Sequence, residues 1–179
     1  MIRRGEFPGV VLVGFMGSGK SSVGKELARR VGAEFVDVDE WIERSSGREI
    51  RDLFADEGEV AFRRRESAAL REILAVEGRV VATGGGAFMD EGNRELLKGY
   101  GPVVYLEAKP ETILHRLSGD AVRPLLRGGD REKIARDLLG RRIPGYRKAD
   151  FSVGTDDRTV PEVADRIVER LAKRGGGRS

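Results

Sequence analysis

The sequence predicts an α/β fold of three layers, in which a five-stranded parallel sheet carries helices on both faces. Two observations support this prediction. Short apolar runs rich in β-branched residues recur along the 179 residues, and amphipathic helical patterns fill the intervals between them. Strands that alternate with helices form parallel sheets through right-handed crossovers. Because such sheets bind ligands at the carboxyl ends of their strands, functional residues should follow strand ends.

Five apolar runs have the length and composition of buried strands. They cover residues 10–13, 35–38, 80–82, 103–106 and 151–153. The first run ends in glycine and leads through a loop to a helical pattern formed by Val23, Leu27, Ala28 and Val31, which Gly32 should end. The strongest later helical patterns cover residues 60–76, 110–117, 131–142 and 161–173.

Domain organisation is predicted to be simple. No repeat or linker divides the chain, so residues 1–173 should form a single domain. Residues 118–130 are rich in glycine and arginine and interrupt the alternation, which indicates a mobile loop. The tail, residues 174–179, is expected to be disordered.

Composition excludes several kinds of site. Cysteine is absent and His115 is the single histidine, so disulfides, thiolate catalysis and zinc clusters are excluded, and any metal must be held by oxygen. The N-terminus lacks the apolar core of a secretory signal, and no run of eighteen apolar residues exists, which favours the cytoplasm and no membrane contact. The net charge of +3 is spread without a long basic tract, so small anionic ligands are favoured over nucleic acid.

The loop after the first strand has the pattern G-x-x-x-x-G-K-[ST] at residues 14–21. Glycines let backbone N–H groups curl round phosphates, the helix N-terminus adds positive charge, and the lysine reaches the outer phosphates. A glycine-rich turn that binds nothing is the bland alternative, but both flanking elements fit nucleotide binding. ATP with Mg²⁺ is the predicted cofactor. The predicted contacts are Gly17, Ser18, Gly19, Lys20, Ser21 and Ser22, with the Ser21 hydroxyl toward the metal.

The second strand is expected to end in Asp37-Val38-Asp39. Alternation along a strand would place Asp37 and Asp39 on the same side. The third strand leads into Gly84 without an acid, so Asp37 is the best candidate for the magnesium site. Asp39 could orient an acceptor hydroxyl and take its proton; alternatively, it caps the helix that begins near Glu40. The triple glycine 84–86 could cradle a substrate or simply form a tight connection.

Three arginines stand in suggestive positions: Arg63 after Phe62, Arg123 in the glycine-rich loop, and Arg142 near the end of a helical pattern. A guanidinium is the natural partner of a carboxylate or phosphate. Most arginines, however, lie on solvated helix faces, and spacing alone does not choose among these three.

Five blocks of the sequence resemble the shikimate kinase family. They are GFMGSGKSSVGKELA, DVDEWIE, LFADEGEVAFRRRE, ATGGGAF, and VRPLL paired with RRIPGYRKAD. The first block is widespread among nucleotide-binding proteins, whereas the other four together are specific. The resemblance implies a fold close to nucleoside monophosphate kinases and transfer of the ATP γ-phosphate to the 3-hydroxyl of shikimate, on the route to chorismate and the aromatic amino acids.

The resemblance also implies roles for single residues. Asp39, Arg63, Gly85, Gly86 and Arg142 match the shikimate site, with both arginines on the carboxylate and Asp39 on ring hydroxyls. Ser21 and Asp37 match the magnesium site, and Lys20 and Asp39 the catalytic groups. Arg123 matches a catalytic lid arginine that closes over the phosphates, and Arg116 and Pro161 match residues that flank adenine. The family expectation is a monomer.

Two other readings remain open from the sequence. A kinase for another small acceptor, such as gluconate or a nucleoside monophosphate, shares the P-loop and could use the same arginines. The second alternative is a nucleotide-dependent switch or assembly ATPase, which would hydrolyse ATP without an acceptor. The absence of an N-K-x-D motif disfavours a GTPase.

Overall fold

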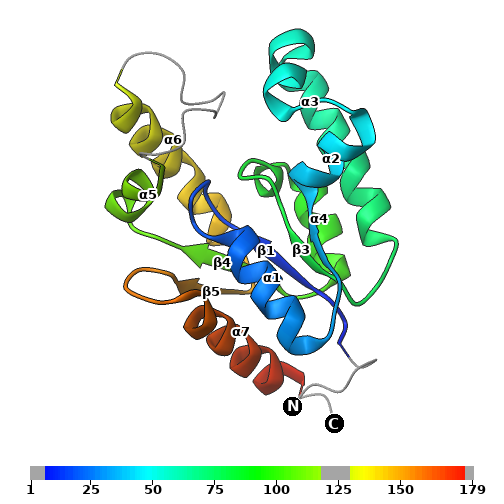
Figure 1. The fold of residues 1–179 in the computed structure, drawn as a ribbon, viewed down its shortest axis with the longest axis vertical. Helices are drawn as coiled ribbons and strands as arrows, with labels where there is room; N and C mark the ends of the chain where they lie inside the picture. The colour runs from blue at the N-terminus through cyan, green and yellow to red at the C-terminus, as the bar shows by residue number, and fades with distance from the viewer. Residues whose placement is uncertain (1–6, 118–129, 176–179) are drawn as a thin grey trace.

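The computed structural model describes residues 7–117 and 130–175 and shows a five-stranded sheet (Figure 1). All neighbouring strands are parallel and their order is β2-β3-β1-β4-β5, which confirms the predicted fold class. The strands are β1 (Val10–Val13), β2 (Phe35–Asp37), β3 (Val80–Ala82), β4 (Val103–Glu107) and β5 (Phe151–Gly154). β1 is central, so the loop that follows it begins in the middle of the carboxyl edge of the sheet.

The helices in the described ranges include those predicted, with some different limits. They are α1 (Lys20–Val31), α2 (Val38–Ser46), α3 (Ile50–Leu74), α4 (Glu91–Tyr100), α5 (Pro110–Leu117), α6 (Arg131–Tyr146) and α7 (Val160–Gly175), with a 3₁₀ turn η1 (Ala87–Met89). α3 begins at Ile50 rather than at residue 60, and α4 was not among the predicted helices. α7 continues to Gly175, so the first two residues of the expected tail are helical. Within the described ranges, no helix combines the length and apolarity needed to cross a membrane.

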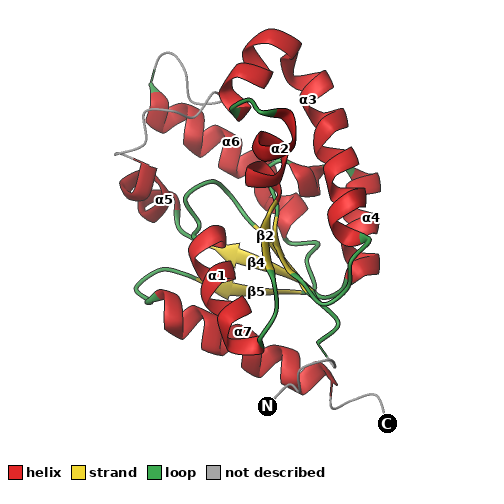
Figure 2. Cartoon of the chain, turned by 45° about the vertical axis from the view of Figure 1, so that its right-hand side comes forward, coloured by secondary structure: helices red, strands yellow, loops and turns green. Residues whose placement is uncertain are grey.

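The two faces of the sheet are covered by different helices, as the alternation of β1 requires. Val10 and Leu12 pack with α1 and α7, whereas Val11 and Val13 belong to the apolar cluster that includes residues of α3, α4 and α6. Figures 1 and 2 show α1 and α7 side by side across one face. Because both faces of β1 are buried, its sequence is continuously apolar and carries no polar alternation.

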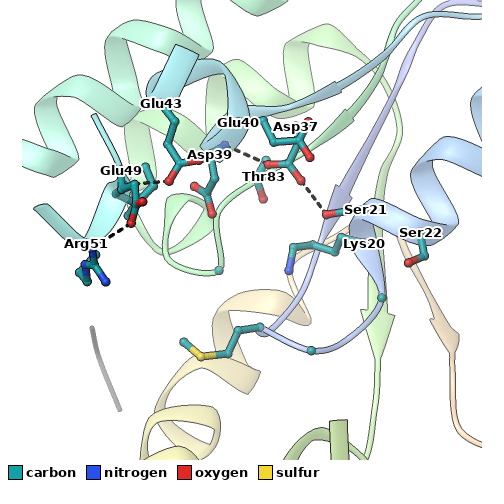
Figure 3. Close-up of a pocket in the computed structure, with 15 residues that line it drawn as sticks. Lys20, Ser21, Ser22, Asp37, Asp39, Glu40, Glu43, Glu49, Arg51 and Thr83 are labelled. Carbon is teal, nitrogen blue, oxygen red and sulfur yellow. Dashed lines mark hydrogen bonds and ion pairs between the residues drawn. The ribbon is translucent and has the colours of Figure 1, made fainter. Parts of the chain in front are cut away.

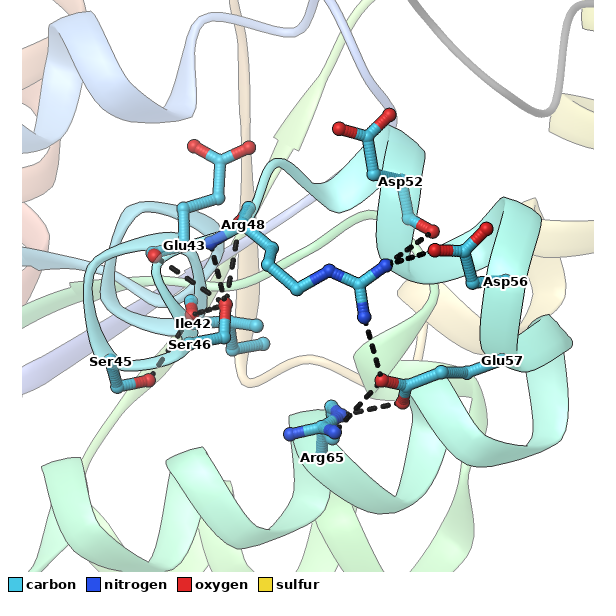
Figure 4. Close-up of polar contacts among 9 residues, drawn as sticks. All are labelled: Ile42, Glu43, Ser45, Ser46, Arg48, Asp52, Asp56, Glu57 and Arg65. Atoms are coloured by element: carbon cyan, nitrogen blue, oxygen red, sulfur yellow. Dashed lines mark hydrogen bonds and ion pairs between the residues drawn. The ribbon is translucent and has the colours of Figure 1, made fainter.

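α3 is bent where Gly58 has a backbone conformation (φ 79°, ψ 172°) that other residues rarely adopt. A polar network spans this bend (Figure 4). Arg48, in the loop before α3, contacts Asp56 and Glu57, and Arg65 beyond the bend donates to Glu57 at 2.7 and 2.9 Å. The network therefore links the first segment of α3 to the loop before it and to the segment beyond the bend. This first segment carries side chains of the site described below.

Candidate active site

The loop between β1 and α1 wraps round the amino group of Lys20. The lysine Nζ donates to the carbonyl oxygens of Gly14 and Phe15, each at 3.0 Å. Gly17 (φ 77°) and Gly19 (φ 93°) take left-handed conformations, and Gly19 immediately precedes α1. The loop thus presents the start of a long helix and a lysine to one cavity, which suits an anion with several phosphates. Lys20, Ser21 and Ser22 all line that cavity of about 440 Å³ (Figure 3).

Ser18 is placed differently from its neighbours in the loop. Its side chain is fully buried, and its hydroxyl oxygen has no hydrogen-bond partner in the part of the chain that the structure describes. Its backbone N–H donates within the loop to Phe15 at 3.1 Å. Ser18 is also not among the residues that line the cavity. The side chain therefore packs beneath the loop, and a phosphate contact by Ser18 stays a prediction.

Asp37 joins the two elements that meet at this cavity. Its Oδ2 accepts from the Ser21 hydroxyl at 2.6 Å, and its Oδ1 accepts from the Asp39 backbone N–H at 3.0 Å. Asp37 is thus the last residue of β2 and the N-cap of α2. One expectation and one alternative were wrong here. The strand does not continue to Asp39, which lies in the first turn of α2, and Asp37, not Asp39, caps that helix.

The Ser21–Asp37 pair fits a magnesium ion. Both groups offer oxygen ligands on the wall of the cavity that contains Lys20. Across residues 7–117 and 130–175, no cluster of three or more His, Cys, Asp or Glu side chains could hold a metal by itself. Mg²⁺ commonly takes one or two protein oxygens and completes its octahedron with water and phosphate. A hydroxyl and a carboxylate beside a phosphate-binding loop meet that requirement.

A second, smaller cavity of about 70 Å³ adjoins the first, since Met16, Asp39, Ile50 and Gly85 line both. Its other lining residues come from the two segments of α3, the glycine turn and α6. They are Phe54, Phe62, Arg63, Glu66, Gly84, Gly86 and Arg142. The structure therefore brings together all five residues that the sequence analysis assigned to the acceptor.

Arg63 is held in place by acids and aromatic rings. Its guanidinium donates to Glu66 at 2.8 Å and to Glu59 at 3.3 Å, and it lies 5.4 and 5.9 Å from the ring centroids of Phe62 and Phe54. Burial opposes the charge of Arg63, but the charges and hydrogen bonds of Glu66 and Glu59 together outweigh it and raise the arginine pKa. The side chain is therefore a fixed cation at the wall of the cavity.

Glu66 is a site residue that the sequence analysis missed. Its side chain is fully buried, and one carboxylate oxygen, Oε1, has no hydrogen-bond partner in the described structure. Burial raises the pKa of Glu66, and the charge of Arg63 only partly offsets this rise. The signal was present, because Glu66 follows Arg63 by three residues and a helix places such residues side by side.

The three glycines 84–86 are explained by the charged groups around them. A Cβ on Gly84 would lie 2.6 Å from Oε1 of Glu66 and 2.9 Å from Oδ1 of Asp39. On Gly86 it would lie 2.6 to 2.7 Å from the guanidinium of Arg63. Any side chain at these two positions would displace the charges that define the cavity. The turn therefore approaches these charged side chains closely, and its role as a substrate cradle stays a prediction.

Arg142 is a buried arginine on the wall of the smaller cavity. It is only 7% exposed, and it lies over the ring of Phe15 at 5.7 Å. Among the described side chains, no carboxylate forms an ion pair with Arg142 within 4.0 Å. Glu66, which lines the same cavity, interacts with Arg142 by charge without forming a direct ion pair. A buried cation that lacks a direct ion pair is costly unless an anion arrives to pair with it. The cavity thus offers a binding position for an acidic group.

The remaining predicted contacts lie at the far end of the phosphate loop. Arg116, in α5, donates to the carbonyl of Gly17 at 3.2 Å and to the carbonyl of Thr155 at 3.1 Å, which ties the loop to the segment after β5. Pro161 lies in the first turn of α7, which follows that segment. Arg123, with residues 118–129 of the predicted loop, lies outside the described residues.

Comparison with known proteins decides the family. The family model described as shikimate kinase matches residues 16–172. The chain belongs to the shikimate kinase family. Its shikimate kinase relative from Thermus thermophilus is 48% identical over 163 residues, covering 90% of this chain and 89% of that protein. As a member of this family, the chain is an ATP-dependent phosphotransferase.

Solved structures agree with the family assignment. A shikimate kinase from Acinetobacter baumannii in complex with shikimate superposes with a TM-score of 0.91 at 42% identity, covering 94% of each chain. A gluconokinase from Sinorhizobium meliloti reaches a TM-score of 0.56 at 20% identity, with coverage of 94% and 98%. The second likeness shows a shared fold alone, so it does not support the gluconate alternative.

Proposed function

We propose that this protein transfers the γ-phosphate of ATP to the 3-hydroxyl of shikimate, giving shikimate 3-phosphate and ADP on the route to chorismate and the aromatic amino acids. The observation that carries the proposal is Arg142, a buried cation that forms no direct ion pair with a carboxylate among the described residues and lines a cavity with Arg63 and Asp39. This cavity adjoins the phosphate-binding loop. An acceptor with one carboxylate and several hydroxyls satisfies both ends of the smaller cavity, and the Acinetobacter relative holds such a molecule.

Binding of the acceptor divides between charge and hydrogen bonding. Arg63 and Arg142 bind the carboxylate, because guanidinium groups pair with carboxylates through parallel N–H donors. Asp39 accepts from ring hydroxyls, and the turn at Gly85 and Gly86 lets the ring approach the backbone. Because Glu66 holds Arg63 by a 2.8 Å ion pair, that arginine is oriented before the acceptor binds.

The transfer step follows from Asp39 lying on the walls of both cavities. The 3-hydroxyl oxygen of the acceptor forms a bond to the γ-phosphorus of ATP while the bond between that phosphorus and the ADP oxygen breaks. The hydroxyl proton goes to the Asp39 carboxylate, which acts as general base. Lys20 binds the β- and γ-phosphates, and Arg123 stabilises the charge that develops on the transferred group.

The nucleotide is held by the backbone of Gly17 to Ser22, which includes Ser18 and Gly19, and by the Lys20 amino group. Arg116 and Pro161 flank the adenine. Ser21 and Asp37 would hold Mg²⁺, with Asp37 acting through water. When bound, the ion neutralises phosphate charge and so lowers the electrostatic barrier to transfer. We further propose that the protein acts as a cytoplasmic monomer, since side chains of a single chain line both cavities.

The decisive test is ADP release by the purified protein with Mg²⁺ and ATP. Parallel reactions contain no acceptor, shikimate, gluconate or a nucleoside monophosphate. The proposal predicts stimulation by shikimate alone, with shikimate 3-phosphate identified by mass. Stimulation by another acceptor would retain the kinase and reject shikimate. Hydrolysis at the same rate in all reactions would support the ATPase alternative.

A further inference from the structure

The last turn of α6 holds a tyrosine that lines neither cavity but contacts the wall of both. Tyr146 is fully buried, and its hydroxyl donates to the carbonyl oxygen of Gly85 at 2.5 Å. Gly85 lines both the phosphate cavity and the smaller cavity. A residue distant from the phosphate loop in sequence therefore fixes the one glycine that the two cavities share.

Two neighbouring contacts hold Tyr146 itself. Its ring stacks on Tyr105 of β4 with centroids 5.0 Å apart and planes 19° from parallel. The preceding Gly145 packs so closely on Met89, in the 3₁₀ turn after the glycines, that a Cβ would lie 2.6 Å from the methionine sulfur. The end of α6 is thus packed against the sheet on one side and against η1 on the other, which leaves the phenol little freedom.

The phenol also belongs to the surroundings of Arg142. Burial raises the pKa of Tyr146 above its ordinary value, while the charge and hydrogen bond of Arg142, one turn earlier, act in the opposite direction. The hydroxyl therefore keeps its proton and remains a donor to Gly85. A Cβ on Gly85 would in turn lie 3.3 Å from Nη1 of Arg142. The three groups form one compact unit.

We propose that Tyr146 is a positioning residue for the acceptor. Its hydrogen bond to Gly85 sets the glycine turn at the distance from Arg142 that the acceptor requires. This inference rests on the proposed function and adds a residue that touches neither substrate. Removing the hydroxyl leaves the partly buried carbonyl of Gly85 without its donor, so the turn can move relative to Arg142. The phosphate loop keeps its own contacts through Lys20 and Asp37.

The test is Tyr146→Phe, which keeps the ring and its stacking, with Tyr105→Phe as the matched control. Steady-state kinetics give the KM for shikimate and for ATP, and calorimetry gives the Tm of each protein. We expect the KM for shikimate to rise roughly tenfold in Tyr146→Phe while the KM for ATP stays within about twofold. Tyr105→Phe should change neither KM value.

Two results would overturn the inference. One is an equal rise of both KM values with a lower Tm, because this pattern indicates general loss of packing. The other is an unchanged KM for shikimate. If Tyr146→Phe is too unstable for kinetics, titration of shikimate and ADP separately at low temperature gives the same comparison of affinities. The wild-type protein in the same experiment tests the proposed function separately. If the proposed function is wrong, the wild-type protein shows no shikimate-stimulated ADP release. If only the role of Tyr146 is wrong, the wild-type protein still shows it.

Discussion

The phosphate cavity and the acceptor cavity are built by different means. On the side of Lys20, the phosphate cavity is lined by residues of one short stretch of chain, 16–22, and backbone carbonyls hold the lysine. The acceptor cavity draws on α2, α3, the glycine turn and α6, and its charges are held by a buried ion pair and by packing on aromatic rings.

This contrast has an energetic consequence. A charge held by nearby carbonyls at a partly exposed loop can be removed with little effect on folding. A charge buried beside a second charge cannot, because the remaining partner is left without compensation. Substitutions on the phosphate side should therefore affect turnover alone, whereas those on the acceptor side should affect binding and stability together.

We expect the largest effect from Lys20→Met. Loss of the amino group should lower kcat about 10³-fold, roughly 4 kcal/mol of barrier, because the positive charge next to the transferred phosphate is gone. The Tm should change little, which calorimetry checks. Lys25→Met, on the exposed face of α1, is the control and should retain activity. A large fall in Tm with Lys20→Met would contradict the claim that charges on the phosphate side can be removed with little effect on stability.

Arg63→Ala should come next and should affect two quantities. Stability should fall by about 3 kcal/mol because Glu66 is left buried without its cation, and the KM for shikimate should rise far more than that for ATP. Adding Glu66→Gln should recover stability but not shikimate binding. Urea unfolding and steady-state kinetics measure the two quantities, and Arg64→Ala, an exposed neighbour, is the control. Recovery of both by the double variant would show that Arg63 is structural only.

Asp39→Asn tests the residue that both cavities share. An amide cannot take the acceptor proton, so kcat should fall about 10²-fold while the protein stays folded. Single-turnover measurement of phosphoryl transfer separates this step from product release. Turnover near that of the wild type would reject the general-base role and leave Asp39 as a binding residue.

Gly58→Ala tests the bend that shapes the acceptor side. At φ 79° and ψ 172° an alanine should cost about 2 kcal/mol of unfolding free energy. Gly140→Ala is the matched control, because this glycine lies inside α6 with open space round it and alanine should stabilise the helix slightly. Equal effects of the two substitutions in urea unfolding would show that the bend is not strained.

The smallest effect concerns the pH dependence of stability. Burial raises the pKa of Glu66 above its ordinary value of 4.5, so the folded protein keeps this proton to higher pH than the unfolded chain does. The free energy of unfolding should therefore fall as pH rises from about 4.5 through the raised pKa, and Glu66→Gln should lack this contribution. Urea unfolding of both proteins across this range measures the difference. Parallel curves would show that Arg63 keeps Glu66 ionised throughout.

Much of the fold was predictable because its signals are local. The apolar runs of the five strands and the helix after the phosphate loop follow from side-chain periodicity, which a residue's neighbours in the chain decide. Boundaries were less predictable. β2 ends at Asp37 because that side chain caps α2, and α3 starts early because the carboxylate of Glu43 accepts from the Ile50 N–H at 2.9 Å. Both outcomes depend on which side chain accepts the hydrogen bond of a particular backbone N–H group.

The sequence by itself determined the nucleotide side of this protein, since the G-x-x-x-x-G-K-S pattern contains its own geometry within eight residues. It also placed Asp39, Arg63 and Arg142 among the candidates, and the resemblance assigned them to the acceptor site. Only the tertiary structure decided that Glu66 holds Arg63, that Arg142 is buried without a direct ion pair in the described part of the chain, and that Tyr146 fixes Gly85. These facts depend on contacts between distant segments, and no local pattern encodes the burial that gives such contacts their energy.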